Sequence, residues 1–239
     1  MSKFINRLIF IAVVAFCLTA LDAVAQGVSP FSGSSVDAKT IKVQKKIDEL
    51  FEQGEYERAF FNYRNELAPI GDKYAQYMVG YMYVTGTGVE EDPLRGSAWY
   101  RLAAERRYQG FLDERDQILA AFSDVDLIRS DNLYLQLRRQ YNDAVLLLDL
   151  VKADLAVLAN RTGSRLSASG SPVTIFDLRS GSSVSADQYF AQVNNRIESR
   201  LKFMAKELDM PYLNTNADQV DFDELETAVE NFVNTINDR

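Results

Sequence analysis

The side chains best suited to do chemistry in this chain are carboxylates. Its 239 residues include 34 Asp and Glu, no histidine and a single cysteine, Cys17. Without histidine the chain lacks the base of a histidine triad and the ligands of an ordinary zinc site. Glycoside hydrolysis needs only two carboxyl groups, roughly 5 to 10 Å apart. Carboxylate chemistry therefore remains open.

One group of acidic residues lies in a predicted turn. Glu90, Glu91 and Asp92 stand directly before Pro93. Glu90 and Glu91 are explained as charges exposed to solvent in the turn. Asp92 is explained as an N-cap, because Asp is favoured at that position and proline is common at the first helical position. We therefore assign no catalytic residue here.

A second group resembles a calcium loop. Residues 214–224, NTNADQVDFDE, alternate oxygen-bearing side chains and end in Glu224. Counting back from that glutamate, however, puts Leu213, Thr215 and Ala217 at the first ligand positions, and the turn glycine is absent. An Asx-rich helix start explains the same residues. We assign no metal-binding or cofactor-binding residue.

The stretch 73–107 predicts two helices joined by a tight turn. Its first half carries an apolar stripe at helical spacing. The residues of this stripe are Ala75, Val79 and Met82. Gly86 and Gly88 supply the backbone freedom that the turn needs. Asp92 and Pro93 then begin a second helix, whose inward face is predicted to be Trp99, Leu102 and Ala103.

The same stretch resembles a Sel-like repeat, a short relative of the tetratricopeptide repeat. The matching residues are Ala75, Val79, Gly80, Met82, Tyr83, Gly86, Gly88, Val89, Asp92, Trp99, Ala103 and Ala104. The chain departs from the family at Gly96, where alanine is usual, and at Arg107, where glycine is usual. Residues 51–69 resemble the second half of a tetratricopeptide pair. The resemblance implies stacked helical repeats that bind proteins, usually without catalysis and without a cofactor.

A second stripe lies beside the core face of the repeat, and it contains Tyr74, Met78 and Tyr81. Two interpretations are open. The stripe packs against a neighbouring helix, or it forms a concave partner-binding surface, since tyrosine and methionine suit either role. These three residues are our candidate partner-binding residues.

Residues 123–239 predict an antiparallel, coiled-coil-like helical bundle. Ser123 and Asp126 form a capping box that starts a long helix. An uninterrupted heptad seam follows in that helix. The seam residues are Tyr134, Leu137, Tyr141, Ala144, Leu148, Val151, Leu155 and Leu158. Two more helices that begin with a capping box, 185–208 and 221–236, can cover this seam within one chain. We therefore expect a monomer.

The stretch 161–184 is predicted to be a Gly/Ser-rich loop. It contains one apolar island, residues 173–176. The island could form one strand of a hairpin, but an isolated hairpin is marginally stable, so packing on the helices is favoured. Left exposed, it could instead pair with a strand of a partner.

The start of the chain predicts export. Lys3 and Arg7 precede a short apolar run, and the small residues Ala23-Val24-Ala25 suit cleavage before Gln26. Residues 1–25 are therefore an expected signal peptide, and 26–35 an expected flexible tether. We therefore expect the protein to be periplasmic or secreted, with no transmembrane span after cleavage. The formal charge of −8 disfavours nucleic acid as a partner.

Together these features predict an all-α protein, with a short α/α solenoid of Sel-like or tetratricopeptide-like repeats at 36–122 and a helical bundle at 123–239. The expected function is a non-catalytic scaffold that binds another protein of the envelope or periplasm. Two alternatives stay open. They are a carboxylate-dependent hydrolase of cell-wall glycan and a self-assembling coiled-coil structural protein.

The predicted cleavage site gives a first test. Protein recovered from the periplasm is expected to begin at Gln26, because the small-residue site is read by a signal peptidase. Intact-mass measurement checks this. Recovery of the chain in the membrane fraction with residues 1–25 still attached would contradict the export signal.

Overall fold

The computed structural model describes residues 38–160, 174–177 and 181–236. The predicted signal peptide and tether lie outside these residues. The helices are α2 (Ala38–Glu52), α3 (Tyr56–Asn62), α4 (Lys73–Thr85), α5 (Pro93–Ala104), α6 (Gln109–Ala120), α7 (Asp124–Tyr141), α8 (Asp143–Ala159), α9 (Ala186–Glu207) and α10 (Phe222–Val233). A short π-helical segment, η1 (Tyr63–Leu67), and a 3-10 turn, η2 (Ala68–Ile70), follow α3, and two short strands, β1 (Thr174–Asp177) and β2 (Ser182–Ser185), precede α9. The all-α prediction is confirmed.

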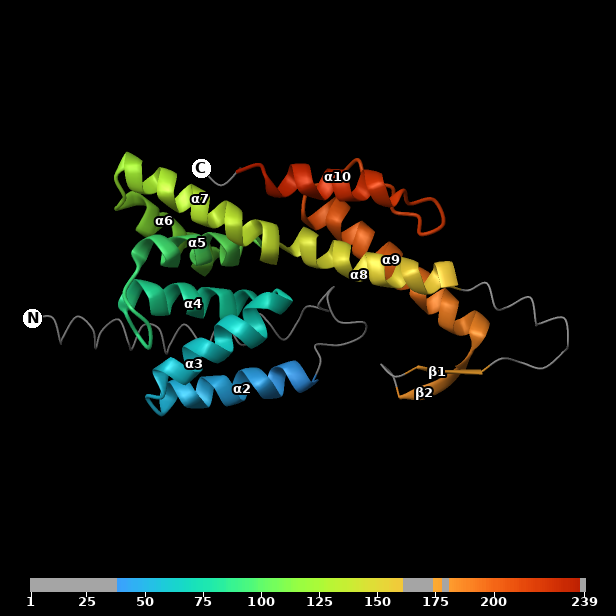
Figure 1. The fold of residues 1–239 in the computed structure, drawn as a ribbon, viewed down its shortest axis with the longest axis horizontal. Helices are drawn as coiled ribbons and strands as arrows, with labels where there is room; N and C mark the ends of the chain where they lie inside the picture. Colours follow the sequence, from blue (N-terminus) through green and yellow to red (C-terminus); the bar gives the residue numbers. More distant parts are fainter. Residues whose placement is uncertain (1–37, 161–173, 178–180, 237–239) are drawn as a thin grey trace, which may run out of the picture.

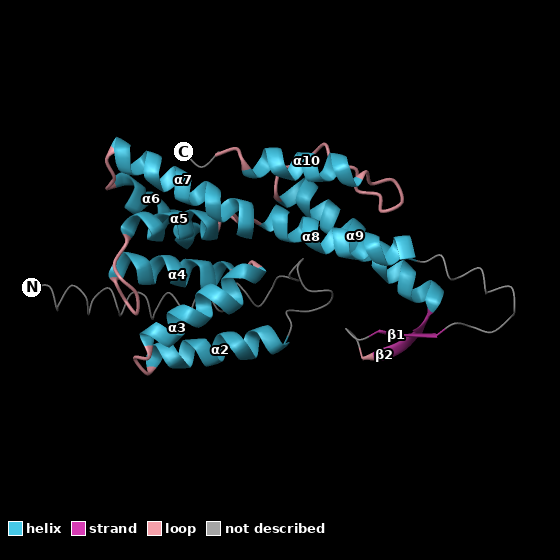
Figure 2. Cartoon of the chain, viewed as in Figure 1, coloured by secondary structure: helices cyan, strands magenta, loops and turns pink. Residues whose placement is uncertain are grey.

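The helices form a stack that continues into a bundle. Figure 1 shows α2, α3, α4 and α5 in successive layers, with α7 on the far side of α5. Helix α8 leads away from the stack, and α9 and α10 lie along it. The colouring by secondary structure in Figure 2 shows the two strands at the distal end of α9, away from the helical stack. Among the described residues, none of the helices is both long and apolar enough to cross a lipid bilayer.

The α4–α5 pair has the caps that its sequence predicts. Asp72 accepts a hydrogen bond from the Ala75 backbone N–H (2.8 Å), and Asp92 accepts one from Arg95 (3.0 Å). Helix α4 ends at Gly86, which has a left-handed backbone with φ 66°. These local bonds satisfy helix-end groups that would otherwise lack partners.

Two glycines let α4 and α5 approach closely. A Cβ atom on Gly80 would lie 2.6 Å from the Tyr100 ring, and one on Gly96 would lie 2.5 Å from the Val84 side chain. The close approach explains Gly96, where the family usually has alanine. Although Trp99 was the large aromatic predicted on the inward face of α5, Tyr100 is the residue that covers Gly80. Trp99 instead stacks on Tyr141, with ring centroids 5.7 Å apart.

The turn of this pair also contacts the preceding pair. Gly88 has φ 73°, and a Cβ atom there would lie 2.4 Å from the backbone carbonyl of Tyr56 at the start of α3. The glycine is therefore required both by its backbone conformation and by close contact. At the end of the pair, Arg107 has φ 58°, in the conformation that the glycine usual at this position adopts without strain.

The long helix predicted after Ser123 is interrupted, and the interruption lies at Asn142. This residue has an extended backbone, ψ 145°, and its side chain accepts a hydrogen bond from the Ala144 N–H (2.7 Å). The heptad seam is consequently divided between α7 and α8. Ser130 lies inside α7, and its hydroxyl group shares a hydrogen bond with that of Ser97 on α5 (2.8 Å).

The interruption separates two hydrophobic cores. Helices α2 to α7 share one, which includes Tyr63, Met82, Trp99 and Tyr134. Helices α8, α9 and α10 share the other. Because α7 packs on the repeat core, the change between cores falls at Asn142 and not near residue 123, where the bundle was predicted to begin.

The predicted loop 161–184 contains a hairpin in its described part. Strands β1 and β2 are antiparallel, and Ile175 is paired with Val184. Both of these side chains are half-buried, whereas Phe176 on the opposite face is 58% exposed. The island therefore forms the hairpin that the sequence analysis did not favour, and this hairpin contacts α9, the helix into which β2 leads. Residues 161–173 lie outside the described part.

The position of Trp99 gives the second test. Its ring is 4% exposed, and Trp99→Ala is expected to lower the free energy of unfolding by about 3 to 5 kcal/mol, since a buried aromatic would leave a cavity. Denaturant midpoints measure the loss. Phe61→Ala, at a 63% exposed position, serves as the control with a change below about 1 kcal/mol. A Trp99→Ala midpoint equal to wild type would contradict the α5–α7 packing.

Candidate functional site

The candidate site is a groove between α2 and α3, here called the α2–α3 groove. Gly54, with φ 80°, turns the chain between the two helices. The groove has a volume of about 420 Å³. Its lining residues are Val43, Lys46, Ile47, Leu50, Glu57, Arg58, Phe61, Asn62 and Glu66. It lies at the end of the helical stack, where no further described helix covers it (Figure 1).

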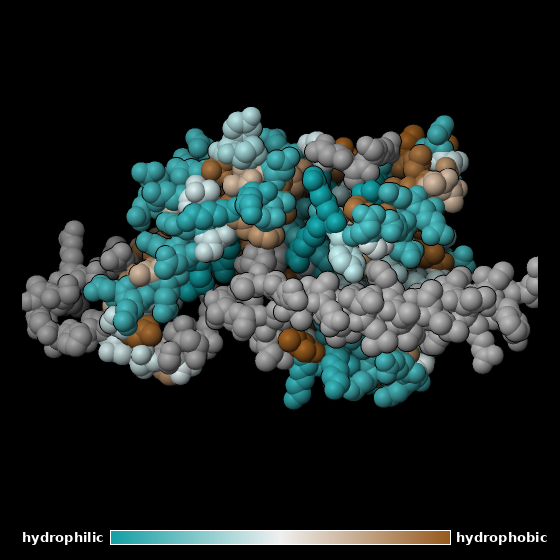
Figure 3. Space-filling view, turned by 180° about the vertical axis from the view of Figure 1, so that it is seen from behind, coloured by the Kyte–Doolittle hydropathy of each residue, from teal (hydrophilic) through white to brown (hydrophobic). Residues whose placement is uncertain are grey.

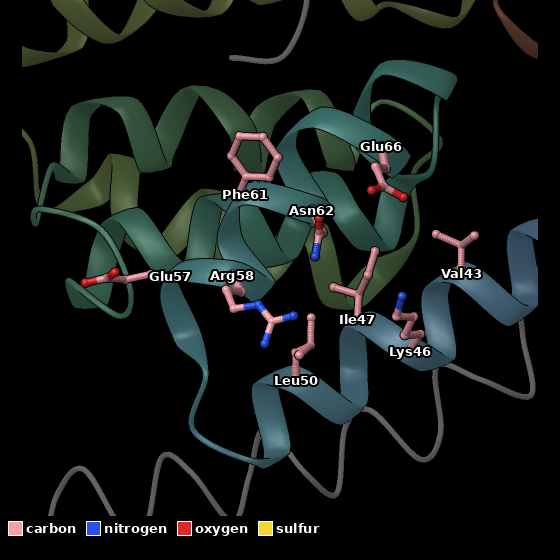
Figure 4. Close-up of a pocket in the computed structure, with 9 residues that line it drawn as sticks. All are labelled: Val43, Lys46, Ile47, Leu50, Glu57, Arg58, Phe61, Asn62 and Glu66. Carbon is pink, nitrogen blue, oxygen red and sulfur yellow. The ribbon is translucent and has the colours of Figure 1, made fainter.

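The groove has an apolar floor. Ile47 and Leu50 of α2 are 2% and 8% exposed, and in Figure 4 they rise toward α3. Phe61 of α3 is 63% exposed at the edge. Figure 3 shows that the face opposite to the view of Figure 1 is mostly hydrophilic, with small separate hydrophobic patches. A large exposed aromatic beside an apolar groove is typical of a surface that binds another molecule.

Charged side chains border the floor. Lys46 and Arg58 lie in the space between the two helices in Figure 4, while Glu57 points away from it. Along α2 the charges are ordered, because the lysines come first and the acids follow. These residues are Lys42, Lys45 and Lys46, then Asp48, Glu49 and Glu52. Of these six residues only Lys46 lines the groove, and the charges along its edge are mixed, with Lys46 and Arg58 alongside Glu57 and Glu66.

Below the groove, Asp48 accepts a hydrogen bond from the Tyr63 hydroxyl. Tyr63 begins a short π-helical segment, Tyr63–Leu67, which continues α3. Burial raises the pKa of Asp48 to about 6, the tyrosine bond opposes this rise, and the negative charges of Asp72 and Glu52 add to it. Burial likewise raises the pKa of Tyr63 far above its usual value. The tyrosine therefore remains a proton donor to Asp48.

The most deeply buried carboxylates are ion-paired. Asp143 lies 2.6 Å from Arg106 Nε and 3.2 Å from Lys73 Nζ. Burial acts to raise the pKa of Asp143, but Lys73 and Arg106 outweigh it, and the pKa is lowered. The pKa of Asp154 is also lowered, because Arg196 and Arg200 outweigh the effect of its burial. Carboxylates held ionised are poor general acids near neutral pH.

Oxygen side chains in the segment 214–224 bond to their own backbone. Asn214 Oδ1 accepts from the Asn216 N–H (3.0 Å), and Asn216 Oδ1 accepts from Asp218 (2.9 Å). Asp221 caps α10 by accepting from the N–H groups of Asp223 and Glu224. Across the described ranges, no three His, Cys, Asp or Glu side chains are placed to hold a metal ion together.

The structure places two of the three candidate partner-binding residues inside the repeat. Tyr74 is 9% exposed and contacts the Tyr63 ring, and Met78 is 2% exposed. Tyr81 is half-buried, with its ring centroid 6.4 Å from that of Phe51. The stripe therefore packs against the neighbouring pair. Of the two interpretations left open, packing within the repeat describes Tyr74 and Met78, and their burial leaves little of either side chain exposed to a partner.

The repeat-defining residues lie where a helical pair needs them. Those with small or apolar side chains are buried: Ala75, Gly80, Tyr83, Trp99, Ala103 and Ala104. The turn residues Gly86, Gly88 and Asp92 close the pair, and the Asp92 N–H donates to the Tyr83 carbonyl (2.8 Å).

The groove residues were not singled out by the sequence pattern. Ile47 and Leu50 belong to an apolar stripe that looks like any buried helix face. Phe61 offered a signal, because it follows Phe60 and therefore falls off the inward face of α3. A second aromatic beside an inward one marks a position that packing alone does not explain.

Comparison with known protein families agrees with this geometry. The model of the Sel1 repeat matches residues 73–108, which span α4, its turn and α5. Sel1 repeats generally mediate protein–protein interactions and are typically non-catalytic. No curated protein and no solved structure matches the chain.

The raised pKa of Asp48 predicts a pH effect on stability. A folded pKa of about 6 lies above the unfolded value of 3.8, so the fold favours the neutral form. The stabilisation that comes from the neutral Asp48 carboxyl is complete below about pH 4. It is lost as the pH rises through about 6, and the loss is at most about 3 kcal/mol. Asp48→Asn keeps a neutral acceptor for Tyr63. It is therefore expected to be more stable than wild type at about pH 8 and similar at about pH 4.

Urea midpoints at both pH values measure this difference. Glu49→Gln, which removes a charge from the adjacent exposed position on α2, is the matched control and is expected to follow wild type. If the Asp48→Asn variant is no more stable than wild type at the higher pH, then ionisation of Asp48 does not lower the free energy of unfolding, and the prediction is wrong.

Proposed function

Given the Sel1 repeat at residues 73–108, we propose that this chain is an exported, non-catalytic scaffold of the cell envelope that binds another protein in the α2–α3 groove. The observation that carries the proposal is the apolar groove floor with Phe61 exposed beside it. The groove stands at the end of a helical stack, where another repeat would pack in a longer array. Such an end face must be covered or polar to remain soluble.

The proposed occupant is an amphipathic helix of the partner. A groove between two helices accepts a third one, with apolar side chains at i, i+3, i+4 and i+7 reaching the floor. The charges at the groove edge would pair with those of the partner. Its acidic residues would lie beside Lys46 and Arg58, and its basic residues beside Glu66.

The proposed address rests on the export signal predicted at residues 1–25. A chain that reaches the periplasm meets envelope proteins as its partners. The absence of cysteine after Cys17 fits this address, since the expected mature chain would fold without a disulfide in an oxidising compartment.

We further propose that the chain is monomeric. The seam residues Ala144, Leu148 and Val151 lie in one core with Ile197 and Leu225 of the same chain. Self-assembly through this seam would require α9 and α10 to leave it. The pairing of Asp143 and Asp154 with cations makes these two carboxylates poor acid catalysts, because an acid catalyst needs a proton to donate.

The test compares two exposed apolar positions. Phe61 and Ile128 are 63% and 60% exposed, but only Phe61 lies at the groove. Phe61→Asp is expected to reduce partner capture from envelope extracts by about tenfold or more, since charge at an anchor position is costly to bury. Ile128→Asp is the matched control and is expected to retain capture.

A photo-crosslinking amino acid at position 61 locates the contact directly. The crosslinked partner peptide is expected to have helical apolar spacing. Thermal melts confirm that both Asp variants remain folded. Equal capture by the Phe61→Asp variant and wild type, or a crosslinked peptide without an apolar stripe, would overturn the proposed site.

A further inference from the structure

A second hollow lies in the bundle, between α10 and the segment that leads into it. We call it the α10 pocket, and its volume is about 360 Å³. It is lined by Met210, Leu213, Val220, Leu225, Ala228 and Phe232, together with polar residues at the edge. The α10 pocket belongs to the second core and shares no lining residue with the α2–α3 groove.

The pocket wall is held in place by local hydrogen bonds. The Met210 N–H donates to the Met204 carbonyl (3.3 Å), and the Leu213 N–H donates to the Met210 carbonyl (3.2 Å). Asn214 Nδ2 donates to the Gln219 carbonyl (3.3 Å), which closes the turn before α10. The pocket is therefore largely preformed, and a ligand would not have to order this segment before binding.

An exposed aromatic stands at the edge of the pocket. Tyr212 lines it and is 100% exposed, while its neighbours Met210 and Leu213 turn inward. A fully exposed tyrosine gains nothing from packing within the chain. It offers a large apolar face and one hydroxyl group to a ligand, the combination that is enriched in binding interfaces.

The charge around the pocket has one sign. Asp209, Asp221 and Glu224 line it, and no lysine or arginine does. The sequence from 207 to 236 contains eight acidic residues and no basic residue. They are Glu207, Asp209, Asp218, Asp221, Asp223, Glu224, Glu226 and Glu230. This concentration of negative charge attracts cations and repels anionic ligands.

Basic side chains from neighbouring elements lie outside the lining. Arg138 of α7 donates to the Phe232 carbonyl (3.2 Å) and to those of Val233 and Thr235, at the end of α10. Lys152 of α8 lies over the Phe222 ring, 5.1 Å from its centroid. Both cations therefore have their own partners, and the edge formed by Asp209 and Glu224 remains negative.

We propose that the α10 pocket binds a lysine- or arginine-rich segment of a partner protein that carries an apolar anchor side chain. The anchor enters the apolar pocket beside Leu225 and Ala228. The basic residues on either side of the anchor pair with Asp209 and Glu224, and a cation or apolar group covers the Tyr212 ring. This site is separate from the α2–α3 groove, so the two proposals can fail independently.

The experiment uses the full mature chain and a labelled synthetic peptide of repeating lysine-leucine-leucine-lysine units. Fluorescence anisotropy is expected to show saturable binding that weakens as salt rises from about 50 to 300 mM. The double variant Asp209→Asn with Glu224→Gln is expected to bind about tenfold more weakly, because it removes two charges at the pocket edge. Tyr212→Ser, at a fully exposed position, is expected to weaken binding as well.

The matched control removes the same charge elsewhere on α10. Glu226→Gln with Glu230→Gln changes two exposed residues that do not line the pocket, and affinity is expected to fall less than about threefold. Equal losses in the two double variants would overturn the proposal and indicate unspecific attraction to an acidic protein. Binding of a peptide with glutamate in place of every lysine as tightly as the lysine peptide, or no saturable binding by wild type, would overturn it too.

Discussion

The arrangement of the two cores depends on a buried network of charges at the interruption between α7 and α8. Lys73 of α4 lies 3.4 Å from Glu105 and 3.2 Å from Asp143. Arg106 pairs with Asp143, and Arg138 of α7 pairs with Glu105 (2.9 Å) while it also caps the end of α10. Removing Asp143 or Glu105 would take away a carboxylate that two cations share, and loss of one partner of a buried ion pair typically costs about 3 to 5 kcal/mol. The network therefore fixes the Sel1 repeat against the bundle in one geometry.

That geometry separates the two proposed binding surfaces. The α2–α3 groove is lined by the first two described helices of the stack, whereas the α10 pocket is lined by α10 and the segment before it, in the bundle. Figure 1 shows these helices at different ends of the described fold. Buried ion pairs contribute little net stability, but they disfavour alternative packings that would leave a charge unpaired. If both proposed surfaces bind partners, a joint packed in this way would hold the two partners at a set distance, which a flexible linker would not do.

The sequence predicts the local features of this fold well and the contacts between distant segments poorly. Asp92, Ser123 and Ser185 cap helices as their patterns indicate, because a cap depends on residues within one turn. The break at Asn142 was missed because its heptad spacing continues on both sides. Only the tertiary structure shows that Tyr134 and Leu148 belong to different cores, since the same spacing serves either partner.

The groove was hidden from sequence reasoning for a related reason. In stacked repeats an apolar stripe has the same sequence pattern whether or not another repeat covers it. The spacing of Ile47 and Leu50 therefore matches that of ordinary core residues. Tyr74 and Met78, on an internal helix, were selected as the surface, and neighbouring helices bury them. The position of a helical pair in the stack decides whether another helix covers its apolar stripe. In this chain the open stripe belongs to the first described pair, where Phe61 extends the apolar surface beyond what α2 and α3 can bury between themselves.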